Sequence, residues 1–170
     1  RQRDPPDMIR DAESRDWPAI LAQNEAWVHD LSPMDAATLD KFARTASYLR
    51  VVEREGEAVA FLLAFRRSGT HDGAVFRHFA ADGGPDFFYV DRIIVDAGAR
   101  MLGLATRLYD DLAAVARAAG AGRLTCEVNA EPPNEGSLAF HRRYGFREVG
   151  RMPHNRKTVA LFEIPVRGPG

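Results

Sequence analysis

The sequence lacks the features that mark secreted, membrane-spanning and metal-binding proteins. Its single cysteine, Cys126, cannot form a disulfide within the chain, so we expect a reducing compartment, with the cytoplasm as the location. No apolar run approaches the ~20 residues that a membrane-spanning helix needs, and no signal-like segment is present. His71 and His78 have no third ligand at a suitable spacing, so we expect no metal.

An excess of charge of one sign is also absent. The chain has 23 basic and 24 acidic residues spread along its length, for a net charge of −1. This removes the electrostatic case for a nucleic-acid-binding protein, because such proteins contact phosphates with a basic surface. We therefore expect neither nucleic acid nor a membrane as a partner.

The length of 170 residues suits one domain with its own core. Residues 1–7 are charged and rich in proline, and we expect a disordered extension there, followed by a single domain over residues 8–170. Apolar periodicity predicts strands at residues 8–11, 49–53, 58–65, 87–95, 123–128, 146–150 and 158–164. It predicts helices at residues 16–29, 32–48, 101–119 and 134–144.

The order of these elements predicts a mixed α/β (α+β) fold. Residues 87–128 form a strand–helix–strand unit, whose two strands must be parallel and joined by a right-handed crossover. Glu55-Gly56 between two apolar runs is typical of a hairpin, and hairpins give antiparallel pairs. Residues 66–86 form a long polar connection, which in a compact domain is usually functional or disordered. We expect one mostly antiparallel central sheet of about seven strands, flanked by about four helices.

The most informative segment is the turn between residues 87–95 and the next helix, which reads Arg100-Met101-Leu102-Gly103-Leu104-Ala105. A turn of small residues before a helix leaves backbone N–H groups unpaired at the positive end of the helix dipole. Such a turn is a site for a phosphate or pyrophosphate. It is neither a G-x-G-x-x-G turn nor a G-x-x-x-x-G-K-[ST] loop, so the usual nucleotide motifs are not indicated.

Two further segments follow in order. The strand Leu124-Thr125-Cys126-Glu127-Val128 has period-two geometry, which places Glu127 on the face opposite to Cys126. Asn134 suits the N-cap of the next helix, which carries His141, and Gly145 suits its left-handed C-cap.

Taken together, the Arg-x-x-Gly-x-Ala turn, the Leu-x-x-Glu-Val strand and the Asn-capped helix resemble the motifs of the GNAT superfamily of N-acetyltransferases, in the same order. The resemblance covers residues 87–150. It implies a GNAT-like fold with a parallel strand pair that splays apart after Val95. It also implies transfer of an acetyl group from acetyl-CoA to a primary amine of a small molecule or peptide. Where the family carries a Tyr four residues before the closing Gly, this chain has His141.

The resemblance implies how acetyl-CoA would be bound. The turn would hold the pyrophosphate mainly through backbone N–H groups, and small residues at its end let the backbone come close. Backbone groups of the preceding strand would bind the pantetheine arm, and an N–H group near Val95 would stabilise the oxyanion. The residues implied in this binding are Ile93, Ile94, Val95, Arg100, Met101, Leu102, Gly103, Leu104, Ala105, Asn134 and Ser137.

The resemblance also implies the catalytic groups. Glu127 would take the proton from the amine, directly or through water. His141 would protonate the departing thiolate of coenzyme A, since an imidazole titrates near neutral pH. Asp91 lies on one face with Val95 and is the rival base. Each has a structural alternative: Glu127 in a salt bridge, His141 packed on a helix face, and Asp91 in a buried ion pair.

Two classes of function remain on this reading. An N-acetyltransferase is favoured over a degenerate acyl-CoA-binding module with a regulatory role, because a pure binder needs neither Glu127 nor His141. A homodimer is common among such small enzymes and is compatible with the sequence.

Overall fold

The computed structural model describes residues 7–166. The extension expected at residues 1–7 lies outside the described residues except for Asp7. The carbonyl oxygen of Asp7 accepts a hydrogen bond from Arg107 Nη2 at 2.8 Å, and its carboxylate lies 3.5 Å from Arg54 Nε. Asp7 therefore belongs to the folded part of the chain.

The described residues form seven strands, five α-helices and two short 3-10 helices. The strands are β1 (Met8–Asp11), β2 (Tyr48–Arg54), β3 (Glu57–Arg66), β4 (Phe87–Val95), β5 (Arg123–Glu131), β6 (Arg147–His154) and β7 (Lys157–Pro165). The α-helices are α1 (Trp17–Ala26), α2 (Ala36–Thr45), α3 (Ala74–Ala80), α4 (Leu104–Ala118) and α5 (Glu135–Tyr144). The 3-10 helices are η1 (Ser14–Asp16) and η2 (Ala97–Ala99).

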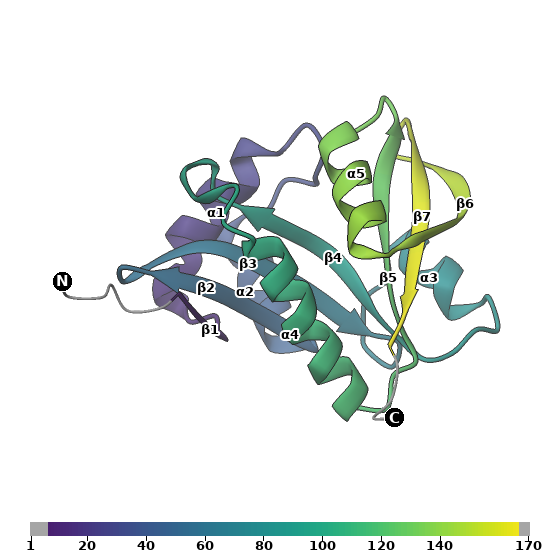
Figure 1. Cartoon of the computed structure of the whole chain (residues 1–170), viewed down its shortest axis with the longest axis horizontal. Helices are drawn as coiled ribbons and strands as arrows, with labels where there is room; N and C mark the ends of the chain where they lie inside the picture. Colours follow the sequence, from purple (N-terminus) through teal and green to yellow (C-terminus); the bar gives the residue numbers. More distant parts are fainter. Residues whose placement is uncertain (1–6, 167–170) are drawn as a thin grey trace. The chain divides into compact units, whose positions relative to one another are not determined.

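The strands hydrogen-bond in the order β1-β2-β3-β4-β5-β7-β6 (Figure 1). Within residues 7–166, β4 and β5 are the one parallel pair, which confirms the predicted mixed, mostly antiparallel sheet. The parallel register runs from Phe87–Arg123 to Tyr89–Thr125. It ends six residues before Val95, earlier than the sequence led us to expect.

The chain divides into two compact units that interleave along the sequence. In the described range, unit 1 contains residues 7–64 and 91–112, and unit 2 contains residues 65–90 and 113–166. The single domain predicted over residues 8–170 stays a prediction.

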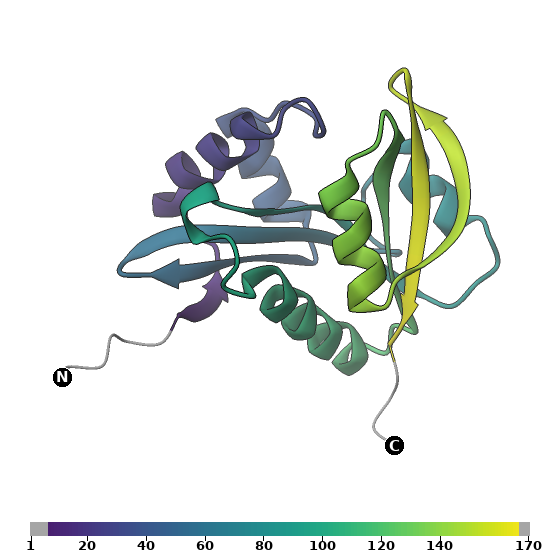
Figure 2. The same cartoon turned by 45° about the horizontal axis from the view of Figure 1, so that its top comes forward.

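Unit 1 places helices on both faces of its strands. Val51 of β2 packs with Ile20 of α1 and Leu39 of α2, whereas the preceding residue, Arg50, donates to Asp111 of α4 at 2.8 Å. Since side chains alternate along a strand, these contacts lie on opposite faces. Figure 2 shows the same arrangement, with α1 and α2 on one side of β2 and β3 and the first half of α4 on the other.

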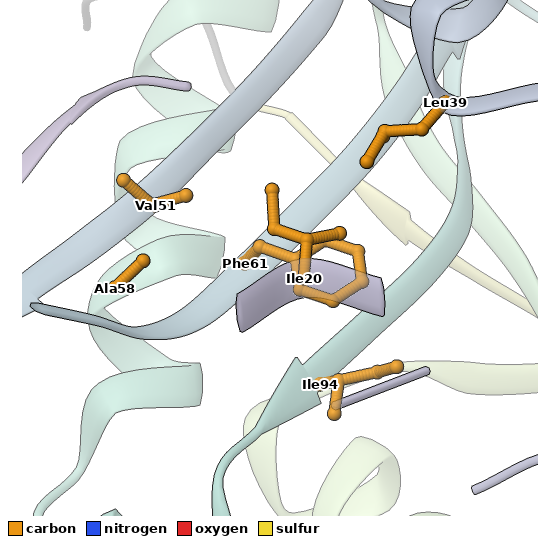
Figure 3. Close-up of a cluster of buried hydrophobic side chains, with 6 residues drawn as sticks. All are labelled: Ile20, Leu39, Val51, Ala58, Phe61 and Ile94. Carbon is orange, nitrogen blue, oxygen red and sulfur yellow. The ribbon is translucent and has the colours of Figure 1, made fainter. Parts of the chain in front are cut away.

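A cluster of buried apolar side chains forms the core of unit 1 (Figure 3). It consists of Ile20, Leu39, Val51, Ala58, Phe61 and Ile94. Burying one side chain of the size of Ile or Phe contributes about 1.5–3 kcal/mol to folding. This cluster therefore fixes α1 and α2 on the strands.

The prediction that a helix begins at Ser32-Pro33 is wrong. α2 begins at Ala36, and the carboxylate of Asp35 caps it by accepting from the N–H of Thr38 at 2.8 Å. The carbonyl oxygen of Ser32 instead accepts hydrogen bonds from the side chains of Asn24 and Arg92, both at 3.1 Å. These bonds hold the segment before Asp35 outside the helix.

Unit 2 contains β5, β7 and β6, with α5 beside β5 and β7 in both views (Figure 1). The expected long loop at residues 66–86 is wrong in one respect, because residues 74–80 form α3. Its buried residues Val75, Phe76 and Phe79 have helical spacing. Seven residues flanked by Gly and Pro are too short for such a pattern to stand out in the sequence.

Candidate active site

The turn before α4 has a backbone shape that few residues adopt. Asp96 begins it by accepting from the N–H of Gly98 at 3.2 Å. Met101 follows with φ +66° and Gly103 with φ +71°, both in the left-handed region. Glycine enters this region readily, whereas another residue pays roughly 1–2 kcal/mol. α4 therefore begins at Leu104 and not at Met101 as predicted, and the Met101 side chain is 99% exposed.

The start of α4 presents backbone N–H groups with no partner inside the helix. The first helical bond joins Arg107 N–H to the carbonyl oxygen of Gly103 at 3.1 Å, so the N–H groups of Leu104, Ala105 and Thr106 precede it. The helix dipole makes this end positive. A Cβ atom added at Gly103 would meet no protein atom within 4 Å, so a ligand has access to the backbone here. These features fit a pyrophosphate group.

The side chain of Arg100 is engaged elsewhere in unit 1. Its guanidinium lies over the ring of Trp27, 4.6 Å from the centroid. A cation–π contact of this kind is worth about 0.5–1 kcal/mol at an exposed site. A pyrophosphate bound at the turn would therefore depend on the backbone N–H groups, as the sequence suggested.

At the end of β4, the predicted donor-binding residues differ in their surroundings. The side chain of Ile94 belongs to the unit 1 core, whereas those of Ile93 and Val95 are half-buried. The N–H of Asp96 donates to the carbonyl oxygen of Val59 at 2.8 Å. Backbone contacts from Ile93, Ile94 and Val95 to a pantetheine arm stay a prediction.

Asp91, the rival base, is held by a cation. Arg92 Nε lies 2.7 Å from the Asp91 carboxylate. Nη1 of the same arginine donates to Asn24 Oδ1 at 2.7 Å and to the carbonyl oxygen of Ser32 at 3.1 Å. Both members of the ion pair are largely buried, with side-chain exposures of 11% for Asp91 and 6% for Arg92. This network ties β4 to the segment after α1. It matches the structural alternative for Asp91, although the cation is its sequence neighbour and not a residue of another strand.

In unit 2, Glu127 lies half-buried on β5 and accepts a hydrogen bond from the hydroxyl of Tyr89. The parallel register pairs Tyr89 with Thr125, which shares a face with Glu127. The partner is a neutral phenol, and a phenol that donates to a carboxylate fixes its orientation. Sequence reasoning did not identify Tyr89, because only the β4–β5 register brings the two side chains together.

The ring of His71, on the connection between β3 and α3, lies beside Tyr89. Its ring lies against Phe65, Phe76 and Tyr89, with centroid distances of 4.8, 5.1 and 5.1 Å. Its Nδ1 accepts a hydrogen bond from the N–H of Gly73 at 2.9 Å. The single sequence signal for this packing is the helical spacing of the apolar residues that follow.

His141 has a packed environment on α5. It is 4% exposed, and its ring lies near those of Phe146 and Phe162. Its Nδ1 lies 2.8 Å from the carbonyl oxygen of Ser137 and donates to it. Burial is the main cause that lowers the pKa of His141 below its ordinary value of 6.5, and the bond to Ser137 opposes it. The imidazole is therefore neutral at pH 7, with its proton on Nδ1.

Glu127 and His141 lie on opposite faces of the same strand. The β5–β7 register pairs Cys126 with Phe162, against which the His141 ring is stacked at 6.2 Å. Since side chains alternate, Glu127 points to the other face. The structure therefore does not bring the two predicted catalytic groups together on one face.

Asn134 and Ser137 make local contacts at the start of α5. The Asn134 side chain accepts from the N–H of Ser137 at 3.2 Å, which confirms the predicted cap. The Ser137 hydroxyl lies 3.3 Å from His141 Nδ1. Gly145 ends the helix with φ +123°, as the sequence predicted. A role of Asn134 and Ser137 in binding acetyl-CoA stays a prediction.

Two kinds of feature are absent from residues 7–166. No group of three or more His, Cys, Asp or Glu side chains in this range could hold a metal ion. Likewise, none of the helices in the described part has the length and apolar character that crossing a membrane requires.

Comparison with known proteins gives a family match and a shared fold. Residues 7–146 match the family model described as the acetyltransferase (GNAT) family. No curated protein matches the sequence. Ard1 from Thermoplasma volcanium superposes with a TM-score of 0.77 at 16% identity, over 95% of this chain and 98% of that chain. An identity of 16% is low, so this solved structure establishes a similar fold alone.

Two further solved structures have the same fold. YncA from Salmonella typhimurium, whose structure was solved with its cofactor acetyl-CoA, gives a TM-score of 0.72 at 17% identity, over 98% of this chain and 97% of that chain. The ribosomal-protein-S18-alanine N-acetyltransferase from Escherichia coli gives 0.70 at 18% identity, over 97% of each chain.

Proposed function

Because the chain belongs to the acetyltransferase (GNAT) family, we propose that it is an acetyl-CoA-dependent N-acetyltransferase acting on a primary amine of a small molecule or peptide. The observation that carries the proposal is the half-buried Glu127 carboxylate held by the Tyr89 hydroxyl. A protein that merely binds acyl-CoA has no use for an oriented carboxylate. The similar fold of the ribosomal-protein-S18-alanine N-acetyltransferase from Escherichia coli supports including peptides among the acceptors.

The donor would be held at the turn from Arg100 to Ala105. The pyrophosphate of acetyl-CoA would accept hydrogen bonds from the N–H groups at the start of α4, where the helix dipole favours an anion. Acetyl-CoA itself supplies the thioester that the amine attacks. Gly103 matters here because its missing side chain leaves the backbone open.

Glu127 would act as the general base. The amine nitrogen attacks the thioester carbonyl carbon, a carbon–nitrogen bond forms, and the carbon–sulfur bond then breaks. One proton leaves the nitrogen and goes to the Glu127 carboxylate, directly or through a water molecule. The hydrogen bond from Tyr89 keeps the carboxylate in one orientation for this transfer.

The geometry favours a packing role for His141 over the general-acid role that the resemblance implied. Its one proton is on Nδ1 and is donated to the Ser137 carbonyl oxygen. Protonation of its other nitrogen would place a charge in a site where burial opposes it. A thiol has an ordinary pKa of about 8.5, so coenzyme A can leave as a thiolate and take its proton from water.

The test is release of the coenzyme A thiol from acetyl-CoA, measured with a thiol-reactive dye against a panel of amines. The panel includes polyamines, lysine derivatives and peptides with a free N-terminus. We expect release that depends on the amine and on enzyme concentration. Tight binding of acetyl-CoA without turnover of any acceptor would contradict the proposal and support the acyl-CoA-binding module.

A variant pair tests the base. Glu127→Gln keeps the size of the side chain and removes the proton acceptor, so we expect the rate at pH 7 to fall by about 10²–10⁴-fold. The loss should shrink at high pH, where a lysine-like amine with a pKa of about 10.4 is already neutral. Glu131→Gln on the exposed end of the same strand is the matched control. An unchanged pH profile in Glu127→Gln would move attention to Asp91.

A further inference from the structure

The connection between β3 and α3 carries a histidine that is built into the surroundings of Glu127. His71 Nδ1 accepts a hydrogen bond from the N–H of Gly73 at 2.9 Å, which restrains the ring. The ring is stacked on Phe76, with an interplanar angle of 26°. A solvated loop histidine would have neither restraint.

Tyr89 is the next member of this group. The edge of the His71 ring meets the Tyr89 ring at 76° and a centroid distance of 5.1 Å, and Phe76 meets it at 78° and 5.8 Å. Edge-to-face contacts of this kind are worth roughly 0.5–1.5 kcal/mol beyond the area they bury. Two neighbouring rings thus restrain the Tyr89 phenol, whose hydroxyl donates to Glu127 Oε2.

We propose that His71 is a positioning residue that acts through the Tyr89 hydroxyl on the Glu127 carboxylate. This inference rests on the proposed function, in which Glu127 takes the proton from the amine. The contacts run from the His71 ring to the Tyr89 ring, and from the Tyr89 hydroxyl to the Glu127 carboxylate. If His71 only filled space, its effect would be the same with and without the Tyr89 hydroxyl.

Gly73 provides a way to move the His71 ring without removing it. A Cβ atom added at Gly73 would lie 2.5 Å from His71 Cε1 and 3.1 Å from Nδ1, so the imidazole must shift. The backbone of Gly73 has φ −63° and ψ 150°, which alanine adopts without strain. Gly73→Ala therefore displaces the ring at little cost to the backbone.

The experiment is a double-mutant cycle on the full chain, with kcat and KM measured for acetyl-CoA and for the best amine of the panel. We expect His71→Ala and Gly73→Ala each to lower kcat by about tenfold, because a small misplacement of a catalytic group has a large effect on rate. The KM for acetyl-CoA should stay unchanged. Tyr89→Phe keeps the ring that His71 contacts and should lower kcat by at least about tenfold through loss of one hydrogen bond to a charged group.

The decisive comparison uses Tyr89→Phe as the background. There, His71→Ala and Gly73→Ala should change kcat less than twofold, since the hydroxyl through which His71 acts is gone; about tenfold losses in both backgrounds would overturn the inference. His78→Ala, an exposed histidine of α3, is the matched control and should leave kcat unchanged. Absence of turnover by the unmodified protein would contradict the proposed function itself, whereas turnover with independent losses contradicts this inference alone.

Discussion

Replacing Gly103 with alanine tests the proposed pyrophosphate site at residues 100–105. The substitution has two separate effects, one on the backbone conformation of the turn and one on the access of a ligand to its N–H groups. Gly103 has φ +71°, where alanine loses roughly 1–2 kcal/mol of folding free energy. The added methyl meets no protein atom within 4 Å, so no clash adds to this loss. In a domain of this size 1 kcal/mol lowers the Tm by about 2–4 °C, so we expect a decrease of about 2–8 °C.

The same methyl would affect the ligand. It would stand beside the N–H groups of Leu104 and Ala105 and hold a phosphate oxygen away from them. Loss of one hydrogen bond to a charged group, about 1.5 kcal/mol, raises the Kd for acetyl-CoA about tenfold. The assay is isothermal titration with acetyl-CoA, at a temperature where the variant remains folded.

Gly56→Ala in the β2–β3 hairpin is the matched control. Gly56 has φ +82° and likewise has no protein atom within 4 Å of an added Cβ. We expect a similar decrease in Tm and an unchanged Kd. Equal affinity for acetyl-CoA in both variants would refute the assignment of the turn as the pyrophosphate site.

Three further predictions concern single side chains. Arg92→Leu removes the cation beside the buried Asp91 carboxylate and should lower the free energy of unfolding in urea by about 3–5 kcal/mol; a loss below about 1 kcal/mol would contradict this account. Burial lowers the pKa of His141 below 6.5, so below that pH the unfolded chain binds one more proton and stability falls by up to about 1.4 kcal/mol per pH unit. The free energy of unfolding of His141→Phe, measured in urea between pH 7.5 and about pH 5.5, should lack this decrease. The same pH dependence in both proteins would contradict the prediction. Arg100 belongs to the proposed pyrophosphate turn and lies on Trp27, one of two tryptophans. Addition of acetyl-CoA should therefore change the intrinsic fluorescence of Trp17→Phe, which keeps Trp27, and leave that of Trp27→Phe unchanged.

Elements with strong local patterns agree with the structure. The strand at residues 87–95 is β4 without a change of bounds, since nine nearly continuous apolar residues suit a strand buried on both faces. The Asn134 cap and the Gly145 end of α5 were also predicted, because both depend on neighbouring residues alone.

Elements whose ends depend on distant contacts differ from the prediction. The helix predicted at residues 32–48 begins at Ala36, because Asn24 and Arg92 bind the carbonyl oxygen of Ser32 and Asp35 caps the helix. α4 begins three residues later than expected because Met101 adopts a left-handed conformation. The local sequence contains no signal for either contact or conformation.

By itself the sequence determined the class of fold, a turn of small residues at 100–105 before a helix, and the presence of Glu127 on a half-buried strand face, since each depends on periodicity or on short-range spacing. Only the tertiary structure decided what surrounds the carboxylate. Tyr89 and His71 lie 38 and 56 residues away from Glu127 along the chain, and the β4–β5 register and the packing of α3 bring them to it. Burial, likewise a property of the folded chain, lowers the pKa of His141, whereas its role as general acid stays a prediction.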